Sequence, residues 1–322
     1  MIAIPAFATV SEDLERVELK MREALSSNNE YLAQVLVYLL QSGGKRLRPA
    51  LALLSARFRT AETTKAVALA AAVELLHTAT LVHDDLIDNS LLRRGNVTLN
   101  ARWNSGATVL AGDYMFAWAA SLAAETENVR VISIFAQTLV TICRGELNQL
   151  FGPTWQDQTK DDYYARIYNK TASLFASATE AGAVLCGLPE PQVQSLRAYG
   201  KNLGMAFQIV DDLLDFVGDA RELGKPVGSD LRQGIVTLPT MHYLRRYPDD
   251  TALARVLTRQ ETEEAAIVEV VSRIAGSDAT SLAFEEARSL ARDAKEALMV
   301  LPDHASRRAM LELADYVVER RM

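Results

Sequence analysis

Residues 66–88 read AVALAAAVELLHTATLVHDDLID, and this stretch decides the fold class. The part that precedes the acidic end is apolar around almost the whole circumference of a helix, which is typical of a helix surrounded by other helices. Residues 173–188 (SLFASATEAGAVLCGL) have the same character, and their alanines permit neighbouring helices to approach closely. The two stretches therefore predict an all-α helical bundle.

The rest of the chain supports this prediction. Glycine and proline account for only 16 and 9 of the 322 residues, which favours long helices over a turn-rich β fold. Alternating strand patterns are nearly absent, and no low-complexity stretch or long linker divides the chain, so we expect a single all-α domain over residues 1–322. The stretches with helical periodicity are 11–41, 46–58, 63–89, 106–124, 127–150, 161–187, 191–217, 235–246, 260–275, 280–299 and 304–320.

Charge, cysteine content and hydropathy exclude several classes of protein. The net charge of −7 leaves no general footprint for nucleic acid, so we expect no nucleic-acid partner. Two cysteines, Cys143 and Cys186, cannot form a disulfide framework, which suits a reducing compartment. The N-terminus lacks a secretory signal, and the longest apolar run, residues 66–73, is far shorter than a membrane span. We therefore expect a soluble, cytoplasmic protein without a transmembrane segment.

An acidic pattern, Asp-Asp-x-x-Asp, occurs twice, each time at the C-terminal end of a strongly apolar helix. The two copies are HDDLID at residues 83–88 and VDDLLD at residues 210–215. In each copy the first and last aspartates are four positions apart and share a helical face, while the middle aspartate lies at the margin of that face. The six carboxylates are Asp84, Asp85, Asp88, Asp211, Asp212 and Asp215.

These clusters predict a metal site. Like charges within one turn destabilise a helix, and acidic residues near its C-terminus oppose the macrodipole, so something positive is expected to bind there. Hard oxygen ligands without a His or Cys cluster select Mg²⁺, which typically joins a few carboxylates to substrate phosphates. We predict two facing triads that clamp a diphosphate through Mg²⁺, with Asp84, Asp88 and Asp211 as metal ligands. The open alternative is that each triad is a solvated acidic helix end.

Basic residues accompany the triads. The stretch GGKRLRP at residues 43–49 places Lys45 and Arg48 on one face of the first turns after two glycines, and a lysine with an arginine suits a diphosphate. We expect Arg46, between them, to be a surface charge. Four further basic residues lie beside the triads or open an apolar helical run, namely Arg93, Arg94, Lys170 and Lys225.

Other polar residues share the helices of the triads. Lys170 lies in an apolar helical run and needs an anionic partner there. Gln208 shares a helical face with Asp211. His77 lies two turns before the first triad on the same face, where it is either a diphosphate contact or a core histidine, whereas His83 faces away and is expected to be structural.

Taken together, these motifs resemble the trans-isoprenyl diphosphate synthases, the family of farnesyl, geranylgeranyl and long-chain polyprenyl diphosphate synthases. The resemblance runs from GGKRLRP through LLHTATLVHDDLIDNSLLRRG and NKTASLF to FQIVDDLLDFVGD and GKPVGSDL, in the order and spacing of the family. It implies an isoprenoid-synthase bundle around a deep central cavity, a Mg²⁺-dependent prenyltransferase, and usually a homodimer. Its substrates would be isopentenyl diphosphate and an allylic diphosphate.

The resemblance also implies roles for individual residues. The six aspartates and Lys170 would form the catalytic group, with both aspartate motifs binding Mg²⁺ that bridges the allylic diphosphate. The further contacts of that diphosphate would be Arg93, Lys170 and Lys225. Isopentenyl diphosphate would be held by Lys45, Arg48, His77 and Arg94, and the reaction centre would be lined by Thr171 and Gln208. One departure is GIVTLP at residues 234–239, where many relatives carry a lysine that contacts diphosphate.

Small residues near the first triad indicate a long product. Ala79 and Thr80 lie about one turn before Asp84 and, because helical side chains lean toward the N-terminus, would line the cavity below the reaction centre. Relatives that stop early often carry an aromatic residue at this level. Phe135 is a candidate for the cavity floor, with core packing as the alternative. We predict a long-chain product of octaprenyl or solanesyl type for a quinone side chain. The alternative is a geranylgeranyl or farnesyl synthase, and more remote ones are a terpene cyclase and a non-catalytic subunit of a heteromer.

Overall fold

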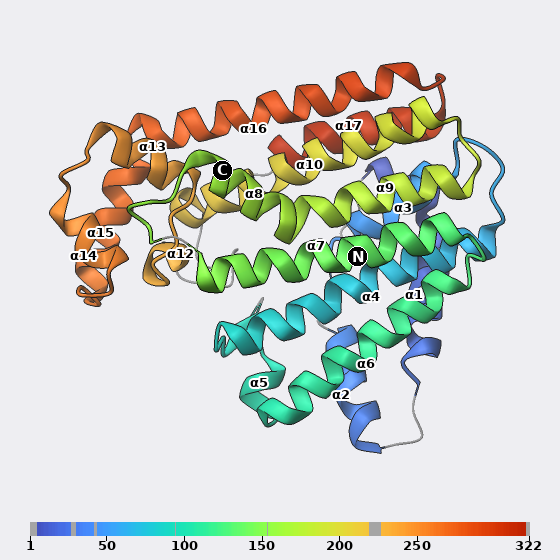
Figure 1. The fold of residues 1–322 in the computed structure, drawn as a ribbon, viewed down its shortest axis with the longest axis horizontal. Helices are drawn as coiled ribbons and strands as arrows, with labels where there is room; N and C mark the ends of the chain where they lie inside the picture. The colour runs from blue at the N-terminus through green and yellow to red at the C-terminus, as the bar shows by residue number, and fades with distance from the viewer. Residues whose placement is uncertain are drawn as a thin grey trace. The chain divides into compact units, whose positions relative to one another are not determined.

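The computed structural model describes residues 5–26, 30–41, 44–93, 95–152, 154–218 and 227–319. Within these ranges the chain is almost entirely helical, and its strand pair is a short hairpin that follows α4 (Figure 1). The prediction of an all-α fold is therefore confirmed.

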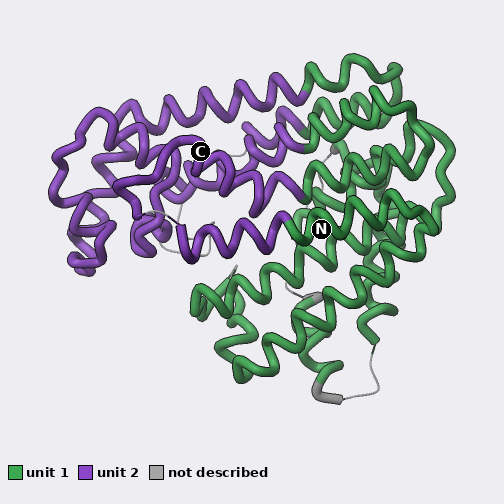
Figure 2. Tube along the Cα trace, in the orientation of Figure 1, with its two compact units in different colours: residues 1–140, 174–200, 295–313 green, residues 141–173, 201–294, 314–322 purple. Residues whose placement is uncertain are grey.

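The chain divides into two compact units, each assembled from three segments (Figure 2). Unit 1 comprises residues 1–140, 174–200 and 295–313, and unit 2 comprises residues 141–173, 201–294 and 314–322. The expected single domain spans both units and stays a prediction.

Unit 1 contains most of the N-terminal helices. Its elements are a 3₁₀-helix (Pro5–Val10), α1 (Ser11–Ala24), α2 (Glu30–Gln41), α3 (Leu47–Ala56), α4 (Thr63–Ile87), β1 (Leu92–Arg93), β2 (Asn96–Val97), α5 (Leu99–Arg102), α6 (Ser105–Ala124), the first part of α7 (Val129–Phe151), most of α9 (Ser173–Leu185), the first part of α10 (Glu190–Val217), a 3₁₀-helix (Leu298–Val300) and the first part of α17 (Ala305–Glu319).

Helix α4 is the central helix of unit 1 and packs against α1, α3 and α6. Every side chain from Ala66 to Leu76 is buried, so the all-round apolar pattern is confirmed as that of a core helix. Among the described residues, α4 alone is long and apolar enough to cross a membrane. However, 72% of its most apolar window is buried inside the unit, as in the core helix of a soluble protein.

The end of α4 places the first aspartate motif. The helix stops at Ile87, and Asn89 follows with a φ of 50°, a left-handed conformation that asparagine adopts more readily than most residues. The chain then turns into the hairpin, in which Leu92 pairs with Val97 and Arg93 with Asn96. The motif therefore lies on the last turn of a rigid, buried helix.

Unit 2 contains most of the C-terminal helices. Its elements are the second part of α7, α8 (Lys160–Ile167), a π-helical turn (Tyr168–Ala172), the second part of α10, α12 (Ser229–Arg232), α13 (Leu238–Arg246), α14 (Thr251–Leu257), α15 (Glu264–Ala275), most of α16 (Asp278–Ala297) and the end of α17.

Two buried clusters form the core of unit 2. One joins Tyr163 of α8, Leu213 of α10 and Leu238 of α13. The other joins Leu231 of α12 to Ile274 of α15. The second aspartate motif lies near the C-terminal end of α10, whose buried residues contribute to both clusters.

The structure corrects several expected helices. Residues 11–41 form two helices rather than one, α1 and α2. Residues 161–187 do not continue as one α-helix, because the turn at Tyr168–Ala172 is π-helical. The helix expected over residues 235–246 begins only at Leu238, after Gly234 with a φ of 69°, and the helix α14 was not expected.

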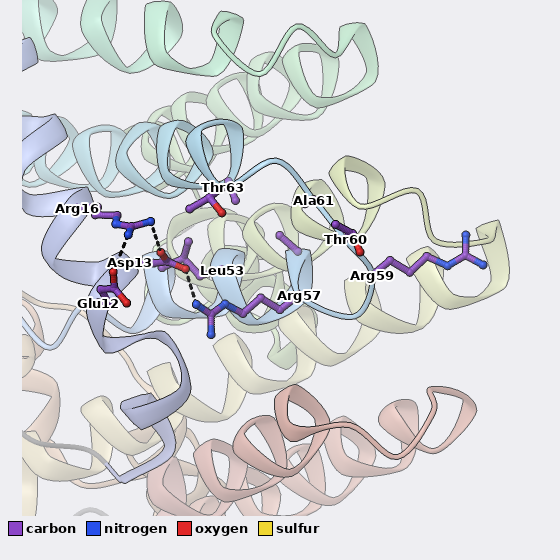
Figure 3. Close-up of a pocket in the computed structure, with 11 residues that line it drawn as sticks. Glu12, Asp13, Arg16, Leu53, Arg57, Arg59, Thr60, Ala61 and Thr63 are labelled. Atoms are coloured by element: carbon purple, nitrogen blue, oxygen red, sulfur yellow. Dashed lines mark hydrogen bonds and ion pairs between the residues drawn. The ribbon is translucent and has the colours of Figure 1, made fainter.

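A cavity of about 300 Å³ lies in unit 1, next to the start of α4 (Figure 3). Charged side chains line it, and Asp13 there pairs with Arg16 and Arg57. Ala66 in its wall precedes Asp84 by eighteen residues on the same helix, which is roughly 27 Å along the axis. This cavity is therefore a different feature from the predicted cavity beneath the reaction centre.

Candidate active site

The first aspartate motif, in unit 1, presents its three carboxylates differently. Asp88 is exposed, Asp84 is half-buried, and Asp85 is buried. The Nε of Arg93 donates a hydrogen bond to Oδ1 of Asp85 at 2.7 Å. Burial raises the pKa of Asp85, against the opposing effect of Arg93. In this structure, Arg93 is therefore paired with a carboxylate of the motif.

The hairpin brings Arg93 back to the motif. Gly95 has a φ of 78° at the turn, and the hydroxyl of Tyr38 donates to the carbonyl of Val97. Thr98 donates to the carbonyl of Ser90 at 2.6 Å, which closes the segment that follows the motif. Arg94 was predicted to contact isopentenyl diphosphate and lies outside the described residues.

The two histidines of α4 have different surroundings. His83 packs against α6, with its Nε2 3.2 Å from the carbonyl oxygen of Val109 and its ring 5.1 Å from that of Phe116. A Cβ at Gly112 would lie 2.2 Å from that Nε2, so a larger residue at this position would force the His83 ring to shift. The structural role expected for His83 agrees with these contacts. His77 is half-buried, and its role as a diphosphate contact stays a prediction.

The segment around Lys45 differs from the expected helical turn. Helix α3 begins at Leu47, so Lys45 precedes it and Arg48 lies in its first turn. The Cζ of Arg48 lies 4.6 Å from the centre of the Phe175 ring, a cation–π contact. The expectation that both residues lie on one face of a helical turn was wrong, because α3 begins only after Arg46, which is left-handed, and Lys45 therefore lies outside the helix.

Arg46 is not a surface charge, contrary to the sequence-based expectation. Its side chain is only 10% exposed and pairs with Glu18 at 2.5 Å and with Glu74 at 2.6 Å. Burial alone would lower the pKa of Arg46, but the two carboxylates outweigh it and raise this pKa. Arg46 therefore joins α3 to α1 and α4.

The second aspartate motif, in unit 2, is mostly buried. Asp211 is half-buried, while Asp212 is buried and accepts hydrogen bonds on both oxygens. The hydroxyl of Tyr163 donates to its Oδ2 at 2.7 Å, and the Nε2 of Gln208 donates to its Oδ1 at 2.8 Å. Burial raises the pKa of Asp212 to about 6, although both donors oppose this rise.

Asp215 is fully buried and is bound to the start of α12. Its Oδ1 accepts from the hydroxyl of Ser229 at 2.7 Å, and its Oδ2 accepts from the backbone N–H of Asp230 at 3.0 Å. Gly228 precedes α12 with a φ of 71°, and a Cβ there would lie 2.4 Å from Val271. Asp215 thus anchors the chain that follows the motif. Lys225, predicted in this segment, lies outside the described residues.

Lys170 and Thr171 lie in the π-helical turn, a feature that often marks functional sites. Lys170 was expected to need an anionic partner, and its Nζ lies 3.1 Å from Oε1 of Glu146 on α7. The two segments approach closely, since a Cβ at Gly145 would lie 2.5 Å from Asn169.

The hydroxyl of Thr171 donates to Oε1 of Gln208 at 2.7 Å. Gln208 in turn donates to Asp212, so a chain of hydrogen bonds connects the π-helical turn to the second motif. The predicted pair Thr171 and Gln208 is therefore brought together by the fold.

The carboxylates that keep solvent access fit a magnesium site. Of the six, only Asp84, Asp88 and Asp211 are not buried, and these are the three predicted as metal ligands. Hard oxygen donors that act together with substrate phosphates are what Mg²⁺ requires. In the described part of the chain, no group of three or more His, Cys, Asp or Glu side chains is gathered closely enough to hold a metal by itself.

The residues predicted to control product length lie in unit 1. Ala79 is fully buried, Thr80 is half-buried and donates to the carbonyl of His77 at 2.7 Å, and Phe135 is buried. Their effect on product length stays a prediction.

Sequence reasoning missed several residues that support the site. Tyr163 lies far from Asp212 in sequence, and no local pattern connects them. Arg166 donates to the carbonyl of Val236 at 2.6 Å, and its charge lowers the pKa of Asp212. Glu146 could have been sought from the sequence, because Lys170 in an apolar helical run was expected to need an anionic partner.

An all-α fold in which two apolar helices end in aspartate motifs, with basic residues beside them, defines the isoprenoid-synthase class. The family model described as polyprenyl synthetase matches residues 29–274, and the chain belongs to this family. The chain is therefore a prenyltransferase of the trans type, and the resemblance predicted from the motifs is confirmed.

Curated relatives and solved structures agree with this assignment. The chain is 40% identical to heptaprenyl diphosphate synthase component 2 of Geobacillus stearothermophilus, over 98% of both chains. It is 35% identical to octaprenyl diphosphate synthase of Escherichia coli, over 96% of both. The crystal structure of a decaprenyl diphosphate synthase from Rhodobacter capsulatus matches with a TM-score of 0.92 and 38% identity, over 99% of both chains. That of a polyprenyl synthase from Caulobacter crescentus, complexed with calcium and isoprenyl diphosphate, matches with a TM-score of 0.94 and 38% identity, over 98% of this chain and 97% of the other.

Proposed function

We propose that this protein condenses isopentenyl diphosphate head-to-tail onto an allylic diphosphate, with Mg²⁺, to make a long-chain all-trans polyprenyl diphosphate for a quinone side chain. The observation that carries the proposal is the accessibility of three carboxylates, Asp84, Asp88 and Asp211, in motifs whose other aspartates are buried. Long-chain synthases among the relatives support the product class.

The chemistry follows from the residues of the two motifs. Asp84, Asp88 and Asp211 would hold Mg²⁺, which when bound stabilises the charge that develops on the leaving diphosphate. Buried Asp212 and Asp215 keep the second motif in place. The allylic C–O bond would ionise, with its electron pair leaving on the diphosphate, and the isopentenyl double bond would attack the carbocation. The departing diphosphate would accept the proton that is then lost, and the apolar walls of the predicted cavity would exclude water.

Two of the predicted diphosphate-binding side chains form ion pairs with carboxylates of the protein. Arg93 is paired with Asp85 and Lys170 with Glu146. An allylic diphosphate carries more charge than one carboxylate, and its charge-assisted bonds to Arg and Lys are strong. We propose that both residues exchange these partners for the allylic diphosphate on binding. Isopentenyl diphosphate would be bound by Lys45, Arg48 and His77.

We further propose a homodimer. Helices α6 and α7 of unit 1 expose large apolar side chains, among them Leu110 at 69% and Val129 at 82%, along with Val109, Ile132 and Val140. Several large exposed apolar side chains on two consecutive helices favour a protein–protein contact there. Two curated relatives are named component 2 of a heptaprenyl synthase, so a heteromer is the alternative. Sedimentation of the purified chain and of Leu110→Glu distinguishes them: a dimer that the substitution dissociates supports the homodimer, and a wild-type monomer contradicts it.

We place the enzyme in the cytoplasm. Both cysteines are free in the structure, Cys143 exposed and Cys186 buried, as in a reducing compartment. Fractionation of cells that produce the protein tests this placement. A soluble cytoplasmic pool is expected, and recovery only from an oxidising compartment would contradict it.

Product analysis tests the proposed function. The purified chain is incubated with isopentenyl diphosphate and geranyl, farnesyl or geranylgeranyl diphosphate, and the dephosphorylated products are separated by chromatography. We expect long-chain products from at least one primer, shortened by Ala79→Tyr or Thr80→Phe because a larger side chain closes the cavity. Phe135→Ala lengthens the product only if that ring is the floor. A wild-type product that stops at farnesyl or geranylgeranyl supports the short-chain alternative, and no product contradicts the proposal.

A further inference from the structure

Arg46 separates the two basic residues proposed to bind isopentenyl diphosphate, and it has an unusual backbone conformation. Its φ of 53° and ψ of 30° are left-handed, and it occupies the N-cap position of α3 without a side-chain cap bond. A non-glycine residue in this region is strained and persists only where its surroundings hold it. The surroundings of Arg46 are therefore informative.

Three helices meet at the guanidinium group of Arg46. Its Nε pairs with Glu18 of α1, and its Nη1 pairs with Glu74 of α4. The Glu74 side chain is only 6% exposed, so its charge is stabilised chiefly by this arginine. The planar guanidinium suits two carboxylates at once, which a lysine ammonium cannot reproduce.

The position of Glu74 connects this network to the substrate site. Glu74 precedes His77 by three residues on α4, so the two lie one helical turn apart on neighbouring positions. Arg46 thus ties the turn that carries Lys45 and Arg48 to the part of α4 that carries His77. Without Arg46, the two glutamates would remain near this site as unbalanced negative charges.

We propose that Arg46 is a positioning residue for isopentenyl diphosphate. It sets the left-handed turn that places Lys45 and Arg48 relative to His77, and it neutralises Glu18 and Glu74, which would otherwise repel the diphosphate. It does not itself contact substrate. The inference rests on the proposed function, since it assumes that these three residues bind isopentenyl diphosphate.

The first test is a comparison of steady-state kinetics. Arg46→Lys keeps one charge but loses the double pairing, and Glu74→Gln removes the buried carboxylate charge. We expect Arg46→Lys to raise the KM for isopentenyl diphosphate about tenfold, and Glu74→Gln to raise it less, because Glu74→Gln loses the same tie between α3 and α4 but also removes a charge that repels the diphosphate. The KM for the allylic diphosphate should change less than about twofold in both variants. Titration calorimetry of isopentenyl diphosphate alone should show the same loss of affinity.

The matched control lies at the other end of the same helix. Arg57 pairs with Asp13 of α1 at 2.6 Å but is 41% exposed. It lines the same cavity as Ala66, which precedes His77 by eleven residues on α4, roughly 16 Å along the helix axis. Arg57→Lys should leave both KM values unchanged. If it raises the KM for isopentenyl diphosphate as much as Arg46→Lys does, the effect is a general loosening of α3 and the inference is wrong.

A double variant shows whether the Arg46–Glu74 pair affects substrate binding directly or only through the stability of the fold. Arg46→Met with Glu74→Met removes both buried charges, and replacing a buried ion pair by apolar side chains often restores stability. We expect its melting temperature to recover while the KM for isopentenyl diphosphate stays high. If the melting temperature and the KM both return to wild-type values, the Arg46–Glu74 pair acts only on stability and the positioning role is wrong.

Substitution of the binding residues distinguishes an error in the proposed substrate site from an error in the proposed role of Arg46. Lys45→Ala and Arg48→Ala are measured in parallel. If they leave binding of isopentenyl diphosphate unchanged, the proposed substrate site is wrong and the role of Arg46 fails with it. If they weaken binding and the Arg46 variants do not, only the positioning role is overturned.

Discussion

The two aspartate motifs share one sequence pattern but are stabilised by different kinds of interaction. In the first, buried Asp85 is balanced by the cation of Arg93 from the hairpin. In the second, buried Asp212 is held by the neutral donors Tyr163 and Gln208. The same spacing therefore produces one motif with a partly exposed ionic partner and one motif in a buried hydrogen-bond network.

This difference has energetic consequences. The Arg93 side chain is 36% exposed and Asp85 is buried, so the exchange that we propose for Arg93 needs the diphosphate to replace a partly exposed cation's carboxylate partner. Buried hydrogen-bond networks are costly to disrupt because a polar group is left without its partner. We therefore expect the second motif to be preorganised and the first to adjust on binding substrate.

The largest expected effect is on turnover. Asp84→Ala and Asp211→Ala each remove an accessible carboxylate, one from each motif, and should lower kcat by about 10²-fold or more. The helical fold should be intact by circular dichroism, and loss of like-charge repulsion could raise the melting temperature of Asp84→Ala without Mg²⁺. Asp293→Ala, on the exposed face of α16, is the control. Near-normal turnover of either variant at saturating Mg²⁺ and substrates would contradict the claim that both motifs are needed for catalysis.

The second prediction concerns the pH dependence of stability. Burial raises the pKa of Asp212 from 3.8 to about 6, so the folded chain binds this proton more tightly than the unfolded chain. Stability therefore falls as the pH rises between these values and is level above them, with a total cost of about 3 kcal/mol. Asp212→Asn removes the charge, so its advantage over wild type should grow by this amount from about pH 3 to pH 8.

Urea denaturation in EDTA measures this difference. Asp88→Asn is the control, because Asp88 is exposed and should show no such growth. A constant difference between Asp212→Asn and wild type across this pH range would mean that Asp212 is not held in a buried environment.

The third prediction addresses the donor to Asp212. Tyr163→Phe removes one hydrogen bond from a buried carboxylate and should lower the free energy of unfolding by about 1–3 kcal/mol. It should also raise the Mg²⁺ concentration needed for half-maximal activity. Tyr199→Phe is a matched control, since Tyr199 is equally buried but donates to the carbonyl of Met310. Equal Mg²⁺ requirements in both variants would show that the hydrogen bonds to Asp212 do not affect Mg²⁺ binding.

The smallest expected effect on stability is that of Arg93→Gln. The loss should be about 1 kcal/mol, because Arg93 is itself 36% exposed and the glutamine amide can still donate to the buried carboxylate of Asp85. The KM for the allylic diphosphate should nevertheless rise, since the same cation is proposed to bind it. Large destabilisation with an unchanged KM would indicate that Arg93 is a structural residue.

The fold class could be predicted because residues 66–82 are apolar around almost the whole circumference of a helix, and only a helix surrounded by others buries such a surface. The aspartate motifs were also evident, since their chemistry is local. Other features depend on contacts between distant segments. The π-helical turn at Lys170 requires the approach of Gly145, and the burial of Arg46 requires two glutamates on other helices. No local pattern encodes either contact.

The second aspartate motif also depends on a contact with a distant segment that its own sequence does not predict. Helical spacing predicted that Asp211 and Asp215 act together, but it could not show that Asp215 is bound to Ser229 of α12. That bond depends on how the chain returns after α10. Spacing identifies which carboxylates are present, and tertiary contacts decide which of them stay accessible.

The central claim is that carboxylates of both motifs serve one metal-dependent condensation. The most direct test is mass analysis of the products that the wild-type chain makes from isopentenyl and farnesyl diphosphates, in Mg²⁺ and in EDTA. We predict a long-chain polyprenyl diphosphate in Mg²⁺ and unreacted substrates in EDTA, with little or no product from Asp84→Ala or Asp211→Ala in Mg²⁺. The same product in EDTA, or from either variant at the wild-type rate, would contradict the account.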